Sequence, residues 1–218
     1  VPQQQSGTGR ISFTVQDLPP LGYRCYKLVS DHEQADAKPA VKIDPEQRTM
    51  QNRFFRITFD SETGALSSIY DRELGRELIS QDADRGANEY IYVSGGAGSS
   101  IVHSRGERPR PELTLSKPKD AEFARGVAGP VSGSMVVRTA GRRTPQIRTT
   151  VTLYRDLKRI DIINRLTKEK TYEKEAAYFA FPFAGQDPTV KLEIPNGVVR
   201  PETDQLTGAC KDWYCVQR

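Results

Sequence analysis

The stretch that decides the fold is Asn52–Ile79, which reads NRFFRITFDSETGALSSIYDRELGRELI. Phe55, Ile57 and Phe59 alternate with polar residues, the period of two that is typical of a strand with one buried face. Gly64 follows within a turn, where a residue without a Cβ atom accepts a positive φ at little cost. A second strand, anchored by apolar side chains, follows the turn. The sequence therefore predicts a β-hairpin at this point of the chain.

Strand patterns also continue on both sides of the hairpin. Alternating or β-branched runs predict strands over residues 11–15, 23–28, 89–93, 112–115, 122–127, 131–139, 146–154, 159–166, 176–181 and 189–194. The first two of these are expected to pair as a second hairpin, after an irregular polar linker over residues 1–10. Helical patterns are scarce and are confined to residues 72–81 and 201–206. Many strands separated by short turns predict an all-β, mostly antiparallel sandwich.

The chain of 218 residues is long enough for one large β domain and part of a neighbour. A charged stretch over residues 31–50 contains two prolines and indicates a boundary. We therefore expect residues 1–50 to hold the end of a small β unit plus a linker. Residues 51–218 are expected to form the large β-sandwich domain, truncated at its C-terminus. The chain begins at Val1 without an initiator and stops without a closing turn, so we expect a piece of a longer protein.

Composition argues against several classes of partner. The net charge of +4, from 32 basic and 28 acidic residues, is spread along the chain. The basic groupings lack interleaved aromatic residues, which argues against a nucleic-acid surface. No apolar run is long enough to span a membrane. The three cysteines are expected to be ordinary thiols, although a Cys210–Cys215 disulfide stays open, and the compartment is not indicated.

Five carboxylates in the opening stretch invite a two-carboxylate catalytic site, but their positions favour structural roles. Asp60 and Glu62 flank a turn, where carboxylates are common. Asp71 is placed to cap the turn that follows it, and Glu73 and Glu77 are expected to be neighbours on an exposed surface. Two asparagines, Asn52 and Asn88, are also expected to be structural.

Four passages, taken in order along the chain, resemble family 38 glycoside hydrolases, the α-mannosidases. The passages are DLPPLGYR at residues 17–24, YDRELGREL at 70–78, KEAAYFAFPF at 174–183, and the stretch from IPNGVVRPETDQL at 194–206 to DWYCVQR at 212–218. The second follows the hairpin as it does at the start of the β-region in that family, and the last resembles a stretch that ends in VQRW. One such passage is a weak signal, whereas four in order are strong. They span most of residues 11–218.

The resemblance implies a fold, a chemistry and a cofactor for the full-length parent. Its largest β-domain would be a supersandwich like that of galactose mutarotase. An N-terminal α/β domain would hydrolyse α-mannosides with retention, using an aspartate nucleophile and a carboxylic acid about 5 Å apart. A zinc ion held by histidines and aspartates would act as Lewis acid and would orient the sugar hydroxyls.

None of this catalytic apparatus can be assigned to the present chain. The family's zinc site includes a His-x-Asp pair, whereas His32 and His103, the only histidines here, are not followed by aspartate two positions later. We expect neither a catalytic residue nor a metal ligand in this chain. The catalytic domain would precede it in the parent.

One group of residues has the composition of a sugar-binding surface. Sugars are amphipathic, so their sites combine aromatic faces with planar polar groups. The candidate residues are Arg200, Glu202, Asp204, Gln205, Trp213 and Tyr214. They are expected to line the rim of the sugar site in the catalytic domain, or else to form an interdomain contact with Trp213 buried.

The sequence thus predicts a non-catalytic β-domain of an α-mannoside hydrolase that is inactive alone and packs against the catalytic domain of its parent. The alternative is a free-standing carbohydrate-binding or structural β-sandwich module without an attached hydrolase.

Overall fold

The computed structural model describes residues 3–6, 9–27, 38–95, 112–185, 188–201 and 203–204. Over these residues the chain forms strands and no helix, which confirms the all-β prediction. Within the same ranges, no helix is long and apolar enough to cross a membrane. The strands are β1 (Gln3–Ser6), β2 (Arg10–Phe13), β3 (Lys42–Asp44), β4 (Thr49–Gln51), β5 (Phe55–Phe59), β6 (Leu66–Asp71), β7 (Arg76–Glu77), β8 (Glu89–Gly95), β9 (Leu113–Ser116), β10 (Lys119–Ala128), β11 (Ser132–Gly141), β12 (Thr144–Tyr154), β13 (Ile160–Thr167), β14 (Glu175–Ala180), β15 (Leu192–Ile194) and β16 (Gly197–Val199).

The predicted hairpin is the centre of a five-stranded sheet in the order β3-β4-β5-β6-β7. Strands β5 and β6 pair antiparallel, with Ile57 opposite Ile69. Phe55, Ile57 and Phe59 are all buried on one face, as the alternation in the sequence requires. The prediction of the hairpin is confirmed.

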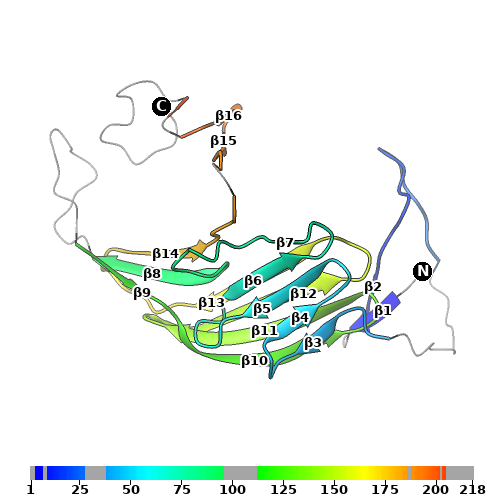
Figure 1. Ribbon diagram of the computed structural model, residues 1–218, viewed down its shortest axis with the longest axis horizontal. Coiled ribbons are helices and arrows are strands. Elements are labelled where there is room, and N and C mark those ends of the chain that lie inside the picture. Colours follow the sequence, from blue (N-terminus) through cyan, green and yellow to red (C-terminus); the bar gives the residue numbers. More distant parts are fainter. Residues whose placement is uncertain are drawn as a thin grey trace.

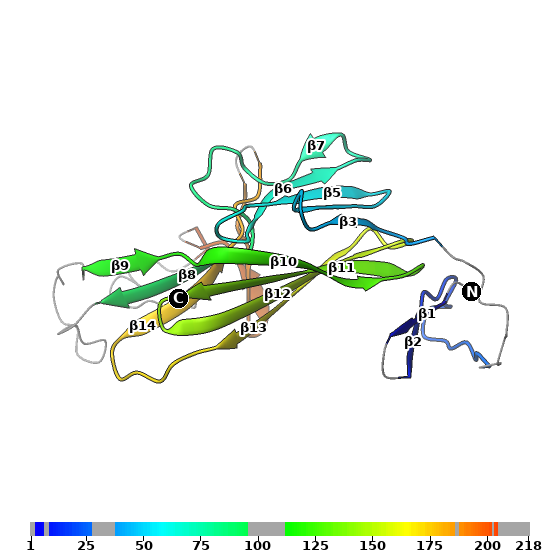
Figure 2. The same ribbon diagram turned by 90° about the horizontal axis from the view of Figure 1, so that it is seen from below.

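A four-stranded sheet in the order β10-β11-β12-β13 lies against the five-stranded sheet, so that the two form a sandwich (Figure 2). Met135 and Val137 from β11, and Val151 and Leu153 from β12, join the buried faces of β5 and β6 in one core cluster. Alternate residues on β12 face away from this core and are more accessible. The two buried faces complete each other, since neither sheet could leave its apolar side in water.

A three-stranded sheet in the order β14-β8-β9 extends to one side of the sandwich (Figure 1). Its inner face carries Tyr90 and Tyr92, which pack with Ile147 of β12 and with Phe179 in a second core cluster.

The outer face of the same sheet is also apolar. Register places Tyr178 beside Ile91 and Val93 beside Leu115, with Leu113 two positions farther along β9. Leu113, Leu115 and Tyr178 are 53%, 54% and 56% exposed. An antiparallel sheet with one wet face normally alternates apolar and polar residues, so an apolar outer face is typical of a sheet that is covered on both sides.

The N-terminal hairpin differs from the prediction. Strand β2 pairs with β1, not with residues 23–28, of which the described residues 23–27 form no strand. The expectation of an irregular linker over residues 1–10 is therefore wrong where β1 forms. The side chain of Gln4 accepts hydrogen bonds from the backbone N–H groups of Val131 (3.1 Å) and Ser132 (2.9 Å), which ties β1 to the turn before β11.

Two further predictions concern the segments around the opening hairpin. The stretch taken as a boundary contains strand β3 and most of strand β4. Strand β3 pairs with β4, and β4 pairs with β5. Met50 of β4 is fully buried. The division of the chain near residue 50 remains a prediction. The helix predicted over residues 72–81 is wrong, because a turn and strand β7 occupy this segment.

Buried polar side chains at the edges of the core are paired. Asn52 Oδ1 accepts from the N–H groups of Phe54 (2.9 Å) and Phe55 (2.7 Å), and its Nδ2 donates to the Tyr154 carbonyl (2.7 Å). Asn88 exchanges two amide hydrogen bonds with Asn164, which also accepts from the Thr149 hydroxyl. Both asparagines are structural, as the sequence predicts.

Gly64 and Gly75 provide a test of the packing between the sheets. Both have positive φ, 70° and 64°. A Cβ on Gly64 would lie 2.6 Å from Val137 Cγ1, whereas a Cβ on Gly75 would meet nothing closer than the Tyr70 hydroxyl at 4.0 Å. We expect Gly75→Ala to lower the free energy of unfolding by about 1–2 kcal/mol through backbone strain. Gly64→Ala should lower it by about 1–3 kcal/mol more through overpacking. Urea denaturation of both variants measures the difference, and equal losses would contradict the close packing of the hairpin on β11.

Candidate functional site

The predicted sugar-binding group follows the small β15–β16 hairpin and is described only in part. Glu202, Gln205, Trp213 and Tyr214 lie outside the described residues. Arg200 and Asp204 are described and contact each other. The Asp204 carboxylate accepts from the Arg200 backbone N–H (2.9 Å) and from its guanidinium Nη2 (2.7 Å) and Nε (3.1 Å).

This contact closes a turn between two surface residues that are four positions apart. Hydrogen bonds from the side chain and then the backbone of Arg200 lower the pKa of Asp204, so the pair stays charged at neutral pH. A forked guanidinium with half of its surface in water retains N–H donors for a second acceptor. The turn therefore presents a fixed pair of polar groups suited to a hydroxyl or carboxylate partner.

The carboxylates of the opening stretch are occupied by the backbone around them. Asp60 Oδ1 accepts from the N–H groups of Glu62 (3.1 Å) and Thr63 (2.7 Å) and from the Thr63 hydroxyl (2.7 Å), which fixes the hairpin turn. Burial alone would raise the pKa of Asp60, but these hydrogen bonds outweigh it and lower the pKa. An ionised carboxylate with one oxygen engaged by three donors of its own turn is a structural group.

Asp71 acts as the predicted cap. Its Oδ1 accepts from the N–H groups of Glu73 and Leu74, both at 3.0 Å. Lys158 from the β12–β13 connection contacts the other oxygen of Asp71 at 2.9 Å and also reaches Glu73. The backbone hydrogen bond from Leu74 is the main cause of the lowered pKa of Asp71.

Glu77 differs from the prediction that it lies on an exposed surface. Its carboxylate accepts from the Ser68 hydroxyl (2.5 Å) and from the backbone N–H groups of Ile69, Leu78 and Ile79. Burial alone would raise its pKa, but these hydrogen bonds lower it. Glu77 thus joins strands β6 and β7. Its carboxylate is the acceptor for the N–H groups of Leu78 and Ile79, which carbonyl groups would accept in a helix.

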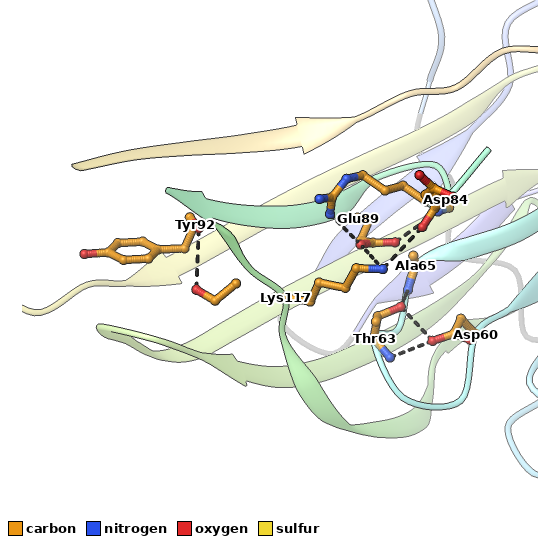
Figure 3. A network of polar contacts seen from close by, with 10 residues as sticks. Asp60, Thr63, Ala65, Asp84, Glu89, Tyr92 and Lys117 are labelled. Carbon is orange, nitrogen blue, oxygen red and sulfur yellow. Dashed lines mark hydrogen bonds and ion pairs between the residues drawn. The ribbon is translucent and has the colours of Figure 1, made fainter. Parts of the chain in front are cut away.

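A polar hollow of about 310 Å³ lies beside the hairpin turn and was not predicted. Figure 3 shows the network of polar contacts that surrounds Glu89 there. Glu89, at the start of β8, is almost fully buried in its wall. It forms ion pairs with Arg85 (3.0 Å) and Lys117 (3.3 Å) and accepts from the Gly86 N–H (3.0 Å). Lys117 also donates to the Asp84 carbonyl. Since Glu89 is paired by two cations and a backbone donor, the network holds the segment before β8 against the β9–β10 turn.

The sequence contained only part of the signal for this hollow. Arg85 and Glu89 are four residues apart, but Lys117 comes from the other side of a long connection.

A further buried network joins Tyr92, whose hydroxyl donates to Glu175, with Lys168, which pairs with the same carboxylate. Burial, followed by the contact with Glu175, raises the pKa of Tyr92.

Among the residues that the structure describes, no three His, Cys, Asp or Glu side chains lie together in a way that could hold a metal ion. His32 and His103 lie outside the described residues, as do Cys210 and Cys215, and Cys25 is an exposed free thiol.

Of the comparisons with known proteins, a family model matches the part of the chain that contains the family-like passages from residue 70 onward. A search of curated proteins finds no match. The model of the glycosyl hydrolases family 38 C-terminal domain matches residues 50–216, which is more than three quarters of the chain. This match begins at β4, immediately before the opening hairpin, and includes the four-stranded and three-stranded sheets. The chain therefore belongs to the family of glycosyl hydrolase family 38 C-terminal domains.

Proposed function

We propose that this chain is a non-catalytic β-domain of an α-mannosidase, whose parent hydrolyses α-mannosides with retention and with the help of zinc. The match to the family 38 C-terminal domain carries this proposal. The family-like passages of the sequence support it, because those from residue 70 onward fall almost entirely within the matched residues 50–216.

The catalytic carboxylates and the zinc ligands would come from an N-terminal catalytic domain of the same parent chain. The engagement of Asp60, Asp71, Glu77 and Glu89 in backbone and lysine contacts supports this division. A nucleophile or general acid needs a carboxyl oxygen within reach of substrate, whereas these oxygens are held by the fold. The described residues do not fit a zinc site, so no step of the reaction is assigned to them.

The role of the domain would be to support the catalytic domain. The apolar outer face of the β14-β8-β9 sheet suits this role, because three of its large side chains are more than half exposed in the chain alone. Phe181 and Phe183, directly after β14, stack on each other with ring centroids 6.0 Å apart and are also exposed. Burying such a surface against another domain would be favourable by about 25 cal/mol per Å².

The Arg200–Asp204 turn would lie at the rim of the sugar site. Its charged pair is fixed by several hydrogen bonds and keeps free donors, which is the kind of preorganised polar group that binds sugar hydroxyls. Glu202, Gln205, Trp213 and Tyr214 would complete this rim.

The reaction is tested with the parent enzyme and the present chain in parallel. The parent should hydrolyse a chromogenic α-mannoside, retain the anomeric configuration by NMR, lose activity with a chelator and regain it with zinc. The 218-residue chain with zinc should show no turnover, because it lacks the catalytic carboxylates. Turnover by the chain alone would refute the non-catalytic role, and a parent that binds mannosides without hydrolysing them would favour the free-standing binding module.

The supporting role is tested at the outer face of the three-stranded sheet. Leu115→Ser should lower the melting temperature of the parent by several degrees, since it removes about 1.5–3 kcal/mol of apolar burial. In the chain alone the same variant should change the melting temperature little, because Leu115 is already exposed. Thr114→Ser, on the opposite face of β9, is the control. Equal effects in the parent and in the chain would show that this face is not covered by another domain.

The rim is tested by Arg200→Ala and Asp204→Ala in the parent. Each should lower kcat/KM about tenfold, the equivalent of one charge-assisted hydrogen bond. Glu193→Ala on the adjacent strand β15 removes an exposed carboxylate from the same hairpin and should leave kcat/KM unchanged. If kcat and KM of the two rim variants equal those of the wild type, the turn does not contact substrate.

A further inference from the structure

Three arginines form a row across the outer face of the four-stranded sheet. Arg138 of β11 pairs in register with Arg148 of β12, and Arg148 pairs with Arg165 of β13. Residues that pair directly in antiparallel strands share a face, with Cα atoms about 4.5–5.5 Å apart. The neighbours Val137, Ile147 and Thr149 are buried on the opposite side, so the three guanidinium groups all lie on the side away from the core.

The three arginines of the row form no ion pair with any acidic residue that the structure describes. All three arginines are exposed, and none has a hydrogen bond, ion pair or aromatic partner there. Glu122 of β10 lies opposite Arg138 and continues the row, but it forms no ion pair. Like charges directly opposite on neighbouring strands are destabilising. The Cα spacing of neighbouring arginines is shorter than the Debye length of about 8 Å, so physiological salt screens their repulsion only in part.

The other end of the same face shows how the fold treats charge when it serves stability. Asp161 of β13 accepts from the Tyr154 hydroxyl and from Arg159 Nε, both at 2.5 Å. Burial, followed by the contact with Asp161, raises the pKa of Tyr154 to about 12. The sheet therefore pairs its charges at one end and leaves three arginines together at the other.

We infer that Arg138, Arg148 and Arg165 form a binding site for a doubly charged oxyanion, a phosphate or sulfate group. A guanidinium presents a planar fork of donors that matches the oxygens of such a group. Arg148 is central, and both flanking arginines can reach an anion placed over it. Gln146 and Thr150 lie on either side of Arg148 on the same face of β12 and provide neutral hydrogen-bonding groups.

The row lies open on the sheet surface, which leaves two possible sources for the oxyanion. A flat sheet face admits either a free ion or the terminal ester of a larger molecule, such as a phosphorylated sugar, whose phosphate monoester is close to doubly charged at neutral pH. The shared chemistry is the divalent oxyanion. The inference does not depend on the proposed hydrolase, because the site lies entirely on this chain.

The test measures the binding of inorganic phosphate and sulfate to the 218-residue chain by calorimetry at constant ionic strength. Both anions should bind the wild-type chain and raise its melting temperature, and chloride should not. Arg148→Gln should weaken the affinity about tenfold, and Arg148→Lys should weaken it less. Arg76→Gln is the matched control, since it removes one exposed strand arginine from the other sheet and should leave the affinity unchanged.

The melting temperature without anion separates binding from a structural role. Arg148→Gln relieves repulsion, so its anion-free melting temperature should equal or exceed that of the wild type. A lower value would overturn the inference, as would the absence of binding or equal binding by all variants. Arg138→Gln and Arg165→Gln provide the same test if Arg148→Gln does not fold.

A sugar phosphate and its unphosphorylated parent distinguish the two sources, because a phosphate monoester carries about the same charge as the free ion at neutral pH. Tighter binding of the ester than of free phosphate would identify an esterified ligand, whereas equal binding would identify the free anion. The unphosphorylated sugar should not bind this site.

Discussion

The contact between the buried face of the β5–β6 hairpin and the buried face of β11 and β12 is the interaction on which the rest of the structure depends. Ile57 and Leu66 on one side, with Met135 and Val151 on the other, are fully buried in one cluster. Each sheet alone would expose a continuous apolar side to water, so neither is stable without the other. The close approach of Gly64 to Val137 shows how little space remains between the two layers.

This contact also explains the use of the acidic residues around the hairpin. The turns and strand ends of a sandwich need a defined conformation relative to the core. Carboxylates that accept hydrogen bonds from several backbone N–H groups fix this conformation. Asp60 fixes the turn, Asp71 fixes the chain after β6, and Glu77 joins β6 to β7. The cluster of carboxylates in this stretch, which could suggest a catalytic site, therefore stabilises the local backbone conformation. The family match identifies the kind of domain, while the contacts show that these side chains are already occupied.

The sequence predicted the features that depend on neighbouring residues. Phe55, Ile57 and Phe59 carry their alternation in the chain itself, so the hairpin could be recognised without a structure. Strand β1 could not, because its polar residues show no alternation and Gln4 finds its partners more than 120 residues away. The helix expected after Asp71 does not form, since the Glu77 carboxylate accepts hydrogen bonds from Ser68 and Ile69 of β6. Arg200 and Asp204, which the sequence places in one candidate sugar-binding group, contact each other in the structure. The arginine row needed the register of three strands, which no single strand contains.

The buried amide pair of Asn88 and Asn164 has a consequence for the uniqueness of the fold. Strands β12 and β13 alternate their side chains regularly, and a slip by one residue would turn every side chain of β13 to the opposite face. Such a slip would carry Asn164 away from Thr149 and leave Asn88 without its partner inside an apolar layer. These directional hydrogen bonds add to the apolar contacts of Ile160 and Ile162 with the core, which the same slip would also break. The asparagine pair therefore specifies one alignment of the strands, and its value to the protein lies in excluding the alternatives.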